Sequence, residues 1–243
     1  MTAQFLQLLP YLMIATGAGL VGGFVARVWS PGVNARGAIQ HFAAGVVIAA
    51  VASDLIPQVE KIGTVPGILG GFAAGGAAMI GLKWVVLKFE KYEEKKHQLP
   101  LGIAAAAGVD TLVDGAIISA GFSSTRELGA LLAIALAVEL FFLTLSVGSE
   151  FHKKKSNSWK GLAVTSLIAL LLLVGALAAF FALQGVSDAT LAIVLAFGAA
   201  ALIYLVAEEL LVESIKAEEN LFSTTMLFAG FLVVLAIKLI SRA

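Results

Sequence analysis

The stretch that decides the fold runs from Pro100 to Phe122 and reads PLGIAAAAGVDTLVDGAIISAGF. It is long enough to cross a bilayer as a helix, because one crossing takes about 20 residues. Asp110 and Asp114 lie near its middle, and their spacing of four places both carboxylates on one face of a helix. A charged side chain at the centre of a bilayer costs about 3 kcal/mol or more. These two acids therefore predict a functional site inside a membrane-spanning helix.

The next apolar run carries a third acid, Glu139, also near its midpoint, and no Lys or Arg lies near the middle of any run. Two carboxylates on one helical face repel each other when both are ionised, so a bound cation would stabilise them. Carboxylate oxygens are hard ligands, which suit Mn, Mg, Ca or Fe(II) more than a zinc-selective site. The three acids predict a metal site. The structural alternative is that protonated or hydroxyl-bonded acids hold the helices together.

The composition defines the class of protein. Hydrophobic residues make up 60% of the chain and charged residues 13%, whereas about 25% of a soluble domain is charged. This is the composition of an integral membrane protein. The formal net charge of zero predicts no basic surface for nucleic acid, and the absence of cysteine excludes disulfides and thiolate metal sites.

Eight apolar runs separated by charged and turn residues predict an all-α integral membrane protein with eight transmembrane helices in a single domain, 1–243. The first run lacks a basic n-region, so we expect it to be a spanning helix and not a cleaved signal peptide. The predicted spans are 5–27, 38–58, 64–87, 100–122, 128–149, 160–183, 189–212 and 221–240.

Lys and Arg in the connections predict the orientation, because cytoplasmic connections are enriched in these residues. They gather between spans one and two, three and four, and five and six, while the opposite side holds few. These three connections are therefore expected in the cytoplasm and both termini outside. The residues are Arg27, Arg36, Lys88, Lys91, Lys95, Lys96, Lys153, Lys154, Lys155 and Lys160.

An internal repeat is visible at an offset of 155 positions. The stretch 42–55, FAAGVVIAAVASDL, aligns with 197–210, FGAAALIYLVAEEL, and Lys83 aligns with Lys238. The offset moves span two onto span seven and span three onto span eight. A shift by five spans reverses the direction of each helix, so the pattern predicts an inverted repeat around spans four and five, a plan that recurs in transporters.

Further polar residues are weaker candidates for a transport pathway. The repeat places Asp54 and Glu209 at equivalent positions on opposite faces, as an entrance and an exit would be, with Glu208 and Glu213 close to the latter. The alternative is that these acids lie at the interface and face water. His41 and Thr111 complete the set; a helix-end role for His41 and a bond from Thr111 to its own backbone are the alternatives.

Three stretches resemble the ZIP family of divalent metal transporters, in the form of a divergent bacterial-type member. The first runs from His41 through Asp54 to Pro57 and is similar to the second span of that family, which ends in a Leu-x-Pro-Glu-like turn. The second, Asp110 to Gly115, lies where the family has His-Asn-x-x-Asp/Glu-Gly. The third, Ala133 to Ser146, resembles the fifth span, with Glu139 at a position that is usually His or Gln.

The chain also departs from the family pattern. Asp110 replaces the first histidine ligand, Thr111 replaces the asparagine beside it, and Phe142 and Leu143 replace the proline and acid of the fifth span. The sixth span has no acid, so a second bridging metal is not expected. These departures leave one site made of carboxylates, and they weaken zinc as the cargo more than they weaken cation transport.

The resemblance implies a secondary transporter, not an enzyme, that moves a divalent cation of the zinc, manganese or iron class toward the cytoplasm without ATP. The metal ion is the cargo, and no cofactor is required. The expected location is the bacterial inner membrane, with lipid and a second copy of the chain as candidate partners. Two alternatives remain: a proton-linked carrier of another small solute, and a membrane scaffold that transports nothing.

Overall fold

The computed structural model describes residues 2–29, 31–94, 101–153, 158–211 and 221–241, and this part of the chain is helical and contains no strand. Eight of its helical segments are long and apolar enough to cross a membrane, which confirms the predicted class. The elements are α1 (Thr2–Val28), α2 (Val33–Ala50), η1 (Val51–Leu55), α3 (Ile56–Ile62), α4 (Val65–Glu94), α5 (Leu101–Ser124), α6 (Arg126–Lys153), α7 (Ser158–Ala182), α8 (Asp188–Leu205), η2 (Val206–Leu210) and α10 (Leu221–Ser241).

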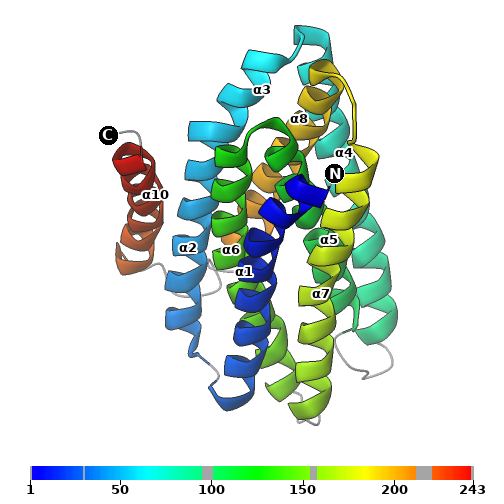
Figure 1. The fold of residues 1–243 in the computed structure, drawn as a ribbon. Helices are drawn as coiled ribbons and strands as arrows, with labels where there is room; N and C mark the ends of the chain where they lie inside the picture. The colour runs from blue at the N-terminus through cyan, green and yellow to red at the C-terminus, as the bar shows by residue number, and fades with distance from the viewer. Residues whose placement is uncertain (1, 30, 95–100, 154–157, 212–220, 242–243) are drawn as a thin grey trace.

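Successive spans run in alternating directions, and α1 begins and α10 ends at the same end of the bundle (Figure 1). We call this end the upper face and the end that holds the connection between α1 and α2 the lower face. At the upper face, Gly185 takes a positive φ of 71° in the turn between α7 and α8. Ser187 then caps α8 by accepting a hydrogen bond from the Thr190 amide. The short polar turn therefore sets where the seventh span begins.

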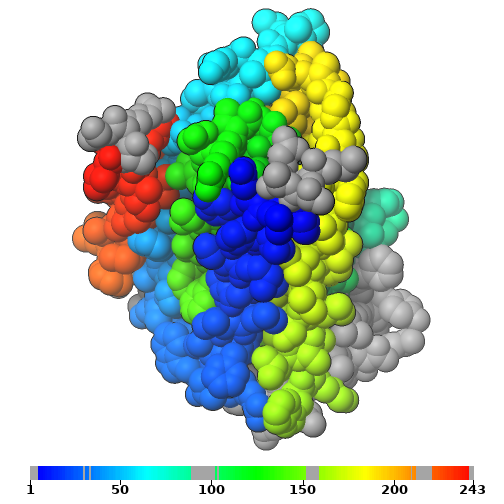
Figure 2. All heavy atoms as spheres, viewed as in Figure 1, coloured from blue at the N-terminus to red at the C-terminus, as the bar shows by residue number. Residues whose placement is uncertain are grey.

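The spans form two groups. In the first, α1, α5, α6 and α7 pack on one another, and Figure 2 shows the atoms of α1 between those of α6 and α7. In the second, α10 packs on α2 and α4 packs on α8. The groups meet where α2 contacts α6 and where α5 contacts α8 and α4. The middle of the bundle is therefore surrounded by α2, α5, α6 and α8.

The second span differs from the sequence prediction. We expected it at 38–58 with a turn at Pro57, but the chain stays helical from Val33 to Ile62. Proline has no N–H for the carbonyl four residues earlier, which is that of Ser53, and its ring crowds that oxygen. The wider turn of the π-helix η1 ends at Leu55, two residues before Pro57, and the Ile56 amide donates to the carbonyl of Val51 five residues earlier. The helix therefore absorbs the proline, and the predicted turn is wrong.

The extended second span also changes the position of His41. We expected this residue at the start of the helix, but α2 begins at Val33, two turns earlier. The His41 ring nitrogen Nδ1 lies 2.9 Å from the carbonyl oxygen of Gly37 in the preceding turn. This contact is local to α2.

Candidate metal centre

The three acids predicted from the sequence lie together in the structure. Asp110 and Asp114 come from α5 and Glu139 from α6. One carboxylate oxygen of each residue lies within 4.8 Å of the other two. Their exposed fractions are 3%, 1% and 1%, so the cluster is closed to solvent. Within the described ranges it is the one group of three or more acidic, histidine or thiol side chains with this geometry.

The packing of α5 explains why its two acids point toward α6. On one face of α5, a Cβ on Gly115 would lie 2.0 Å from the carbonyl oxygen of Leu172, so this face presses against α7. On another face, Ile117 meets Gly198 of α8 and Gly121 meets Leu132 of α6. By the helical period of 3.6 residues, Asp110 and Asp114 share the face of Ile117 and Gly121. The two acids therefore lie between α6 and α8.

Glu139 is oriented by the packing of α6. One face of α6 lies against α1, where the Thr144 hydroxyl is 2.8 Å from the carbonyl oxygen of Gly19 and 2.9 Å from that of Leu140. Leu132, which contacts α5, lies seven residues before Glu139 and so occupies the same side of the helix. Glu139 is therefore directed toward α5 and away from α1.

The hydroxyls of Thr111 and Thr144 bond to backbone carbonyls. Thr111, adjacent to Asp110, donates its hydroxyl proton to the carbonyl of Ala107 at 2.7 Å. The Thr144 hydroxyl lies against α1 as described. Both groups therefore bond backbone, which was the alternative expected for Thr111 from the sequence.

The three carboxylates lie close enough together to be compared with the ligands of one hard cation. Oxygen ligands lie about 2.0–2.6 Å from Mg or Ca, so two oxygens on one ion are at most about 4–5 Å apart. The limit of 4.8 Å among the three oxygens lies within this range for an ion of the size of Ca, and the three side chains would have to move closer together around a smaller ion such as Mg. The group contains neither imidazole nor thiolate, which are the softer ligands that favour zinc. Asp110, Asp114 and Glu139 can therefore supply an all-oxygen set for a divalent cation.

Asp54, a weaker candidate from the sequence, lies in η1 and forms an ion pair that we did not expect. Its Oδ1 lies 2.8 Å from Nζ of Lys238 on α10, and the Ser53 hydroxyl donates to its Oδ2. Nζ of Lys238 also donates to the carbonyl oxygen of Ser53. This is the carbonyl for which Pro57 offers no N–H, so the lysine replaces the missing helical donor.

Glu208, which is adjacent to Glu209, the repeat equivalent of Asp54, lies in η2 and forms an ion pair with Lys83 of α4. Glu209 belongs to the same π-helix, and Glu213 lies outside the described residues. Sequence reasoning missed both lysines as partners of these acids. The repeat contained a signal, because it aligned Lys83 with Lys238.

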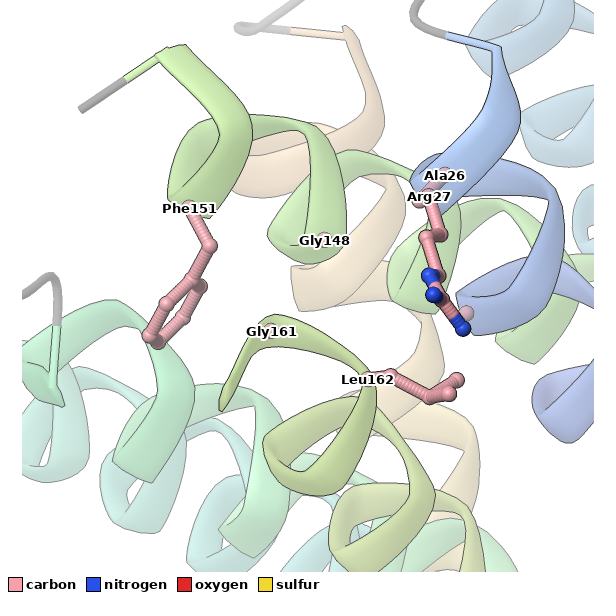
Figure 3. A pocket seen from close by; sticks show the side chains of 7 residues that line it. Ala26, Arg27, Gly148, Phe151, Gly161 and Leu162 are labelled. Atoms are coloured by element: carbon pink, nitrogen blue, oxygen red, sulfur yellow. The ribbon is translucent and has the colours of Figure 1, made fainter. Parts of the chain in front are cut away.

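A small cavity of about 10 Å³ lies near the lower face between α1, α6 and α7, lined by residues that include Arg27, Phe151 and Leu162 (Figure 3). The Arg27 guanidinium stacks 3.8 Å above the centroid of the Trp159 ring. The lining contains a cation and no acid, and the volume suits about one water molecule. We therefore do not consider it a cation site.

Comparison of the chain with known protein families found no match, and comparison with curated proteins found none.

Proposed function

We propose that this chain is a secondary transporter that carries a divalent cation across a membrane through Asp110, Asp114 and Glu139. The observation that carries the proposal is the buried cluster of three carboxylates, with one oxygen of each within 4.8 Å of the other two, midway along two helices that can span a membrane. Ionisable residues inside a membrane are costly, and they mark ion and proton pathways. A divalent cation offsets the repulsion among these acids.

We propose that the chain contains the inverted repeat predicted from the sequence. Three observations support it. The π-helices begin at Val51 and Val206, which are 155 positions apart like the aligned sequences. Gly230 meets the carbonyl of Phe42, and Gly75 meets that of Phe197, its repeat equivalent. Each π-helix also has an acid paired with the lysine of the other half: Asp54 pairs with Lys238 and Glu208 with Lys83, and the two lysines are 155 positions apart.

The repeat supports transport in a specific way. The chain runs upward through α2 and η1 and downward through α8 and η2, so the two π-helices approach opposite faces (Figure 1). Spans four and five, which carry the acids, lie between the two halves in sequence. Transporters built from inverted repeats place the substrate near the midplane between the repeats. This arrangement supports a carrier that opens alternately to each face.

The proposed orientation places the lower face in the cytoplasm and the upper face outside. Arg27, Arg36 and Lys88 lie near the lower ends of α1, α2 and α4, in agreement with the charge rule. Under this proposal, which includes a ZIP-like mechanism, the cation enters past Asp54, binds at the three acids and leaves past Glu208 and Glu209. Transport requires no ATP.

Liposomes that contain only this protein test the proposal. Mn²⁺, Fe²⁺, Zn²⁺, Mg²⁺ and Ca²⁺ are added outside, and entry is followed with an enclosed metal-sensitive dye. We expect entry of at least one of these ions, Mn²⁺ or Fe²⁺ first, and its loss in the double variant Asp110→Asn, Asp114→Asn. Impermeability to all five ions would overturn the proposal and favour a scaffold. Solute uptake that needs a pH gradient and no metal would favour a proton-linked carrier.

A further inference from the structure

We propose that the ion pairs Lys238–Asp54 and Lys83–Glu208 are the two gates of the transport path. In each gate, the lysine ammonium group forms an ion pair with an acid that the cation would otherwise contact as it enters or leaves. This inference rests on the proposed function, because it concerns how the cation reaches and leaves the three central acids. It assigns a role to Lys83 and Lys238, which binding of the cation by the three acids does not explain.

The upper gate has the chemistry of a filled cation site. Nζ of Lys238 meets the Asp54 carboxylate at 2.8 Å and the Ser53 carbonyl oxygen, and the Ser53 hydroxyl is bonded to the same carboxylate. The lysine and aspartate side chains are 12% and 22% exposed, so the contact is largely enclosed. An ammonium surrounded by a carboxylate and a carbonyl occupies the kind of oxygen set that binds a hard metal cation. A passing cation can compete with it.

The lower gate is a simpler and more exposed lysine–carboxylate pair in the other half of the chain. Lys83 of α4 pairs with Glu208 of η2, where the side chains are 44% and 40% exposed. Asp54 lies 20 residues beyond Asn34, the first residue of its span, and Glu208 lies 20 beyond Asp188. At 1.5 Å per residue, each acid is about 30 Å along its helix from the face where the span starts. The two pairs therefore lie near opposite faces.

The gates also lie beside the helices that surround the three acids. η1 contacts α8, and η2 contacts α2. In turn α8 packs on α5 and α2 packs on α6, which are the helices that carry the acids. Asp114 and Glu139 are each 1% exposed, so the structure shows a state in which the centre is closed while both ion pairs are formed. Breaking one pair should open the centre toward one face only.

The chain has no cysteine, which permits a direct test. Thr111→Cys places a thiol beside Asp110 at a position that is 0% exposed. A membrane-impermeant maleimide is added to right-side-out and to inside-out vesicles. The labelling rate is measured in this background alone and after Lys238→Met or Lys83→Met. Asp54→Asn and Glu208→Gln break the same pairs from the other partner, and Lys238→Arg and Lys83→Arg preserve the charge as controls.

We expect Lys238→Met and Asp54→Asn to speed labelling from the upper face, and Lys83→Met and Glu208→Gln to speed it from the lower face. The labelling rate should increase about tenfold or more. An open state that is populated at about 1–10% in the background protein can rise in population by that factor when its closing ion pair is removed. The arginine variants should label at the background rate. Labelling that changes equally from both faces, or not at all, in properly folded variants would overturn the gates and assign the lysines to helix packing. The labelling needs no metal, so failure of the gates and failure of metal transport are distinguishable.

Discussion

Gly230 lies directly against the backbone of Phe42, since a Cβ at position 230 would come within 2.1 Å of the Phe42 carbonyl oxygen. This contact fixes α10 on α2 and brings Lys238, two turns further along α10, to Ser53 and Asp54. Gly75 and Phe197 form the equivalent contact between α4 and α8. Close approach through glycine is a common way for helices to pack in lipid, where no hydrophobic force drives them together.

Gly230→Ala should destabilise the protein. The added methyl group would overlap a backbone oxygen and force α10 away from α2, at a cost of about 1–3 kcal/mol. Gly76→Ala is the matched control, because no atom lies within 4 Å of the Cβ position there. Thermal unfolding of the two variants in detergent checks the prediction. Equal melting temperatures for both would contradict the backbone contact.

Thr144→Val should weaken the contact between α6 and α1. The substitution removes a hydroxyl that lies 2.8 Å from the Gly19 carbonyl oxygen, and hydrogen bonds between membrane helices contribute about 1 kcal/mol. Thr225→Val is the control, since the Thr225 hydroxyl donates only to Leu221 within its own helix and is exposed. The free energy of unfolding should fall for the first variant and stay nearly unchanged for the second. The reverse order would refute the role of Thr144.

The ion pair between Arg36 of α2 and Glu150 of α6 joins the two groups of helices, with Nη1 and Oε1 3.1 Å apart. Arg36→Gln leaves a partly buried carboxylate behind. We expect the melting temperature to fall by about 2–4 °C, as for a loss of about 1 kcal/mol in a chain of this size. The exposed Arg126 gives the control variant Arg126→Gln, which should melt with the wild type. Exchange of the two charges, Arg36→Glu with Glu150→Arg, should recover part of the loss; no recovery would show that the pair itself contributes nothing.

The sequence was sufficient to predict the eight spans and the cluster of three acids. Long apolar runs report directly on membrane spans, and the spacing of Asp110 and Asp114 already placed them on one face of a helix. That Glu139 points to the same place depends on how α6 is rotated. The contact of Thr144 with Gly19 of α1 sets that rotation. The two residues are far apart in the sequence, so no local sequence pattern predicts the contact.

The lysine partners of Asp54 and Glu208 could not be predicted from local patterns. The sequence repeat pairs Lys83 with Lys238, but it does not show that each lysine contacts the acid of the opposite half. That exchange follows from the packing of α10 on α2 and of α4 on α8. The turn predicted at Pro57 was wrong for a related reason, because Lys238 satisfies the carbonyl that the proline leaves without a donor.

The most direct test of the central claim is thermal unfolding of the purified protein with and without divalent cations. At a concentration of 100 times Kd, a bound ion stabilises the folded state by about 2.7 kcal/mol, which corresponds to a rise of about 5–10 °C in melting temperature. We predict such a rise with Mn²⁺ for the wild type and for the control Glu127→Gln, Asp188→Asn, which removes two exposed acids. We predict no rise for Asp110→Asn, Asp114→Asn. A rise that survives in this double variant, or a wild type that no cation of the panel stabilises, would contradict the assignment of the metal site.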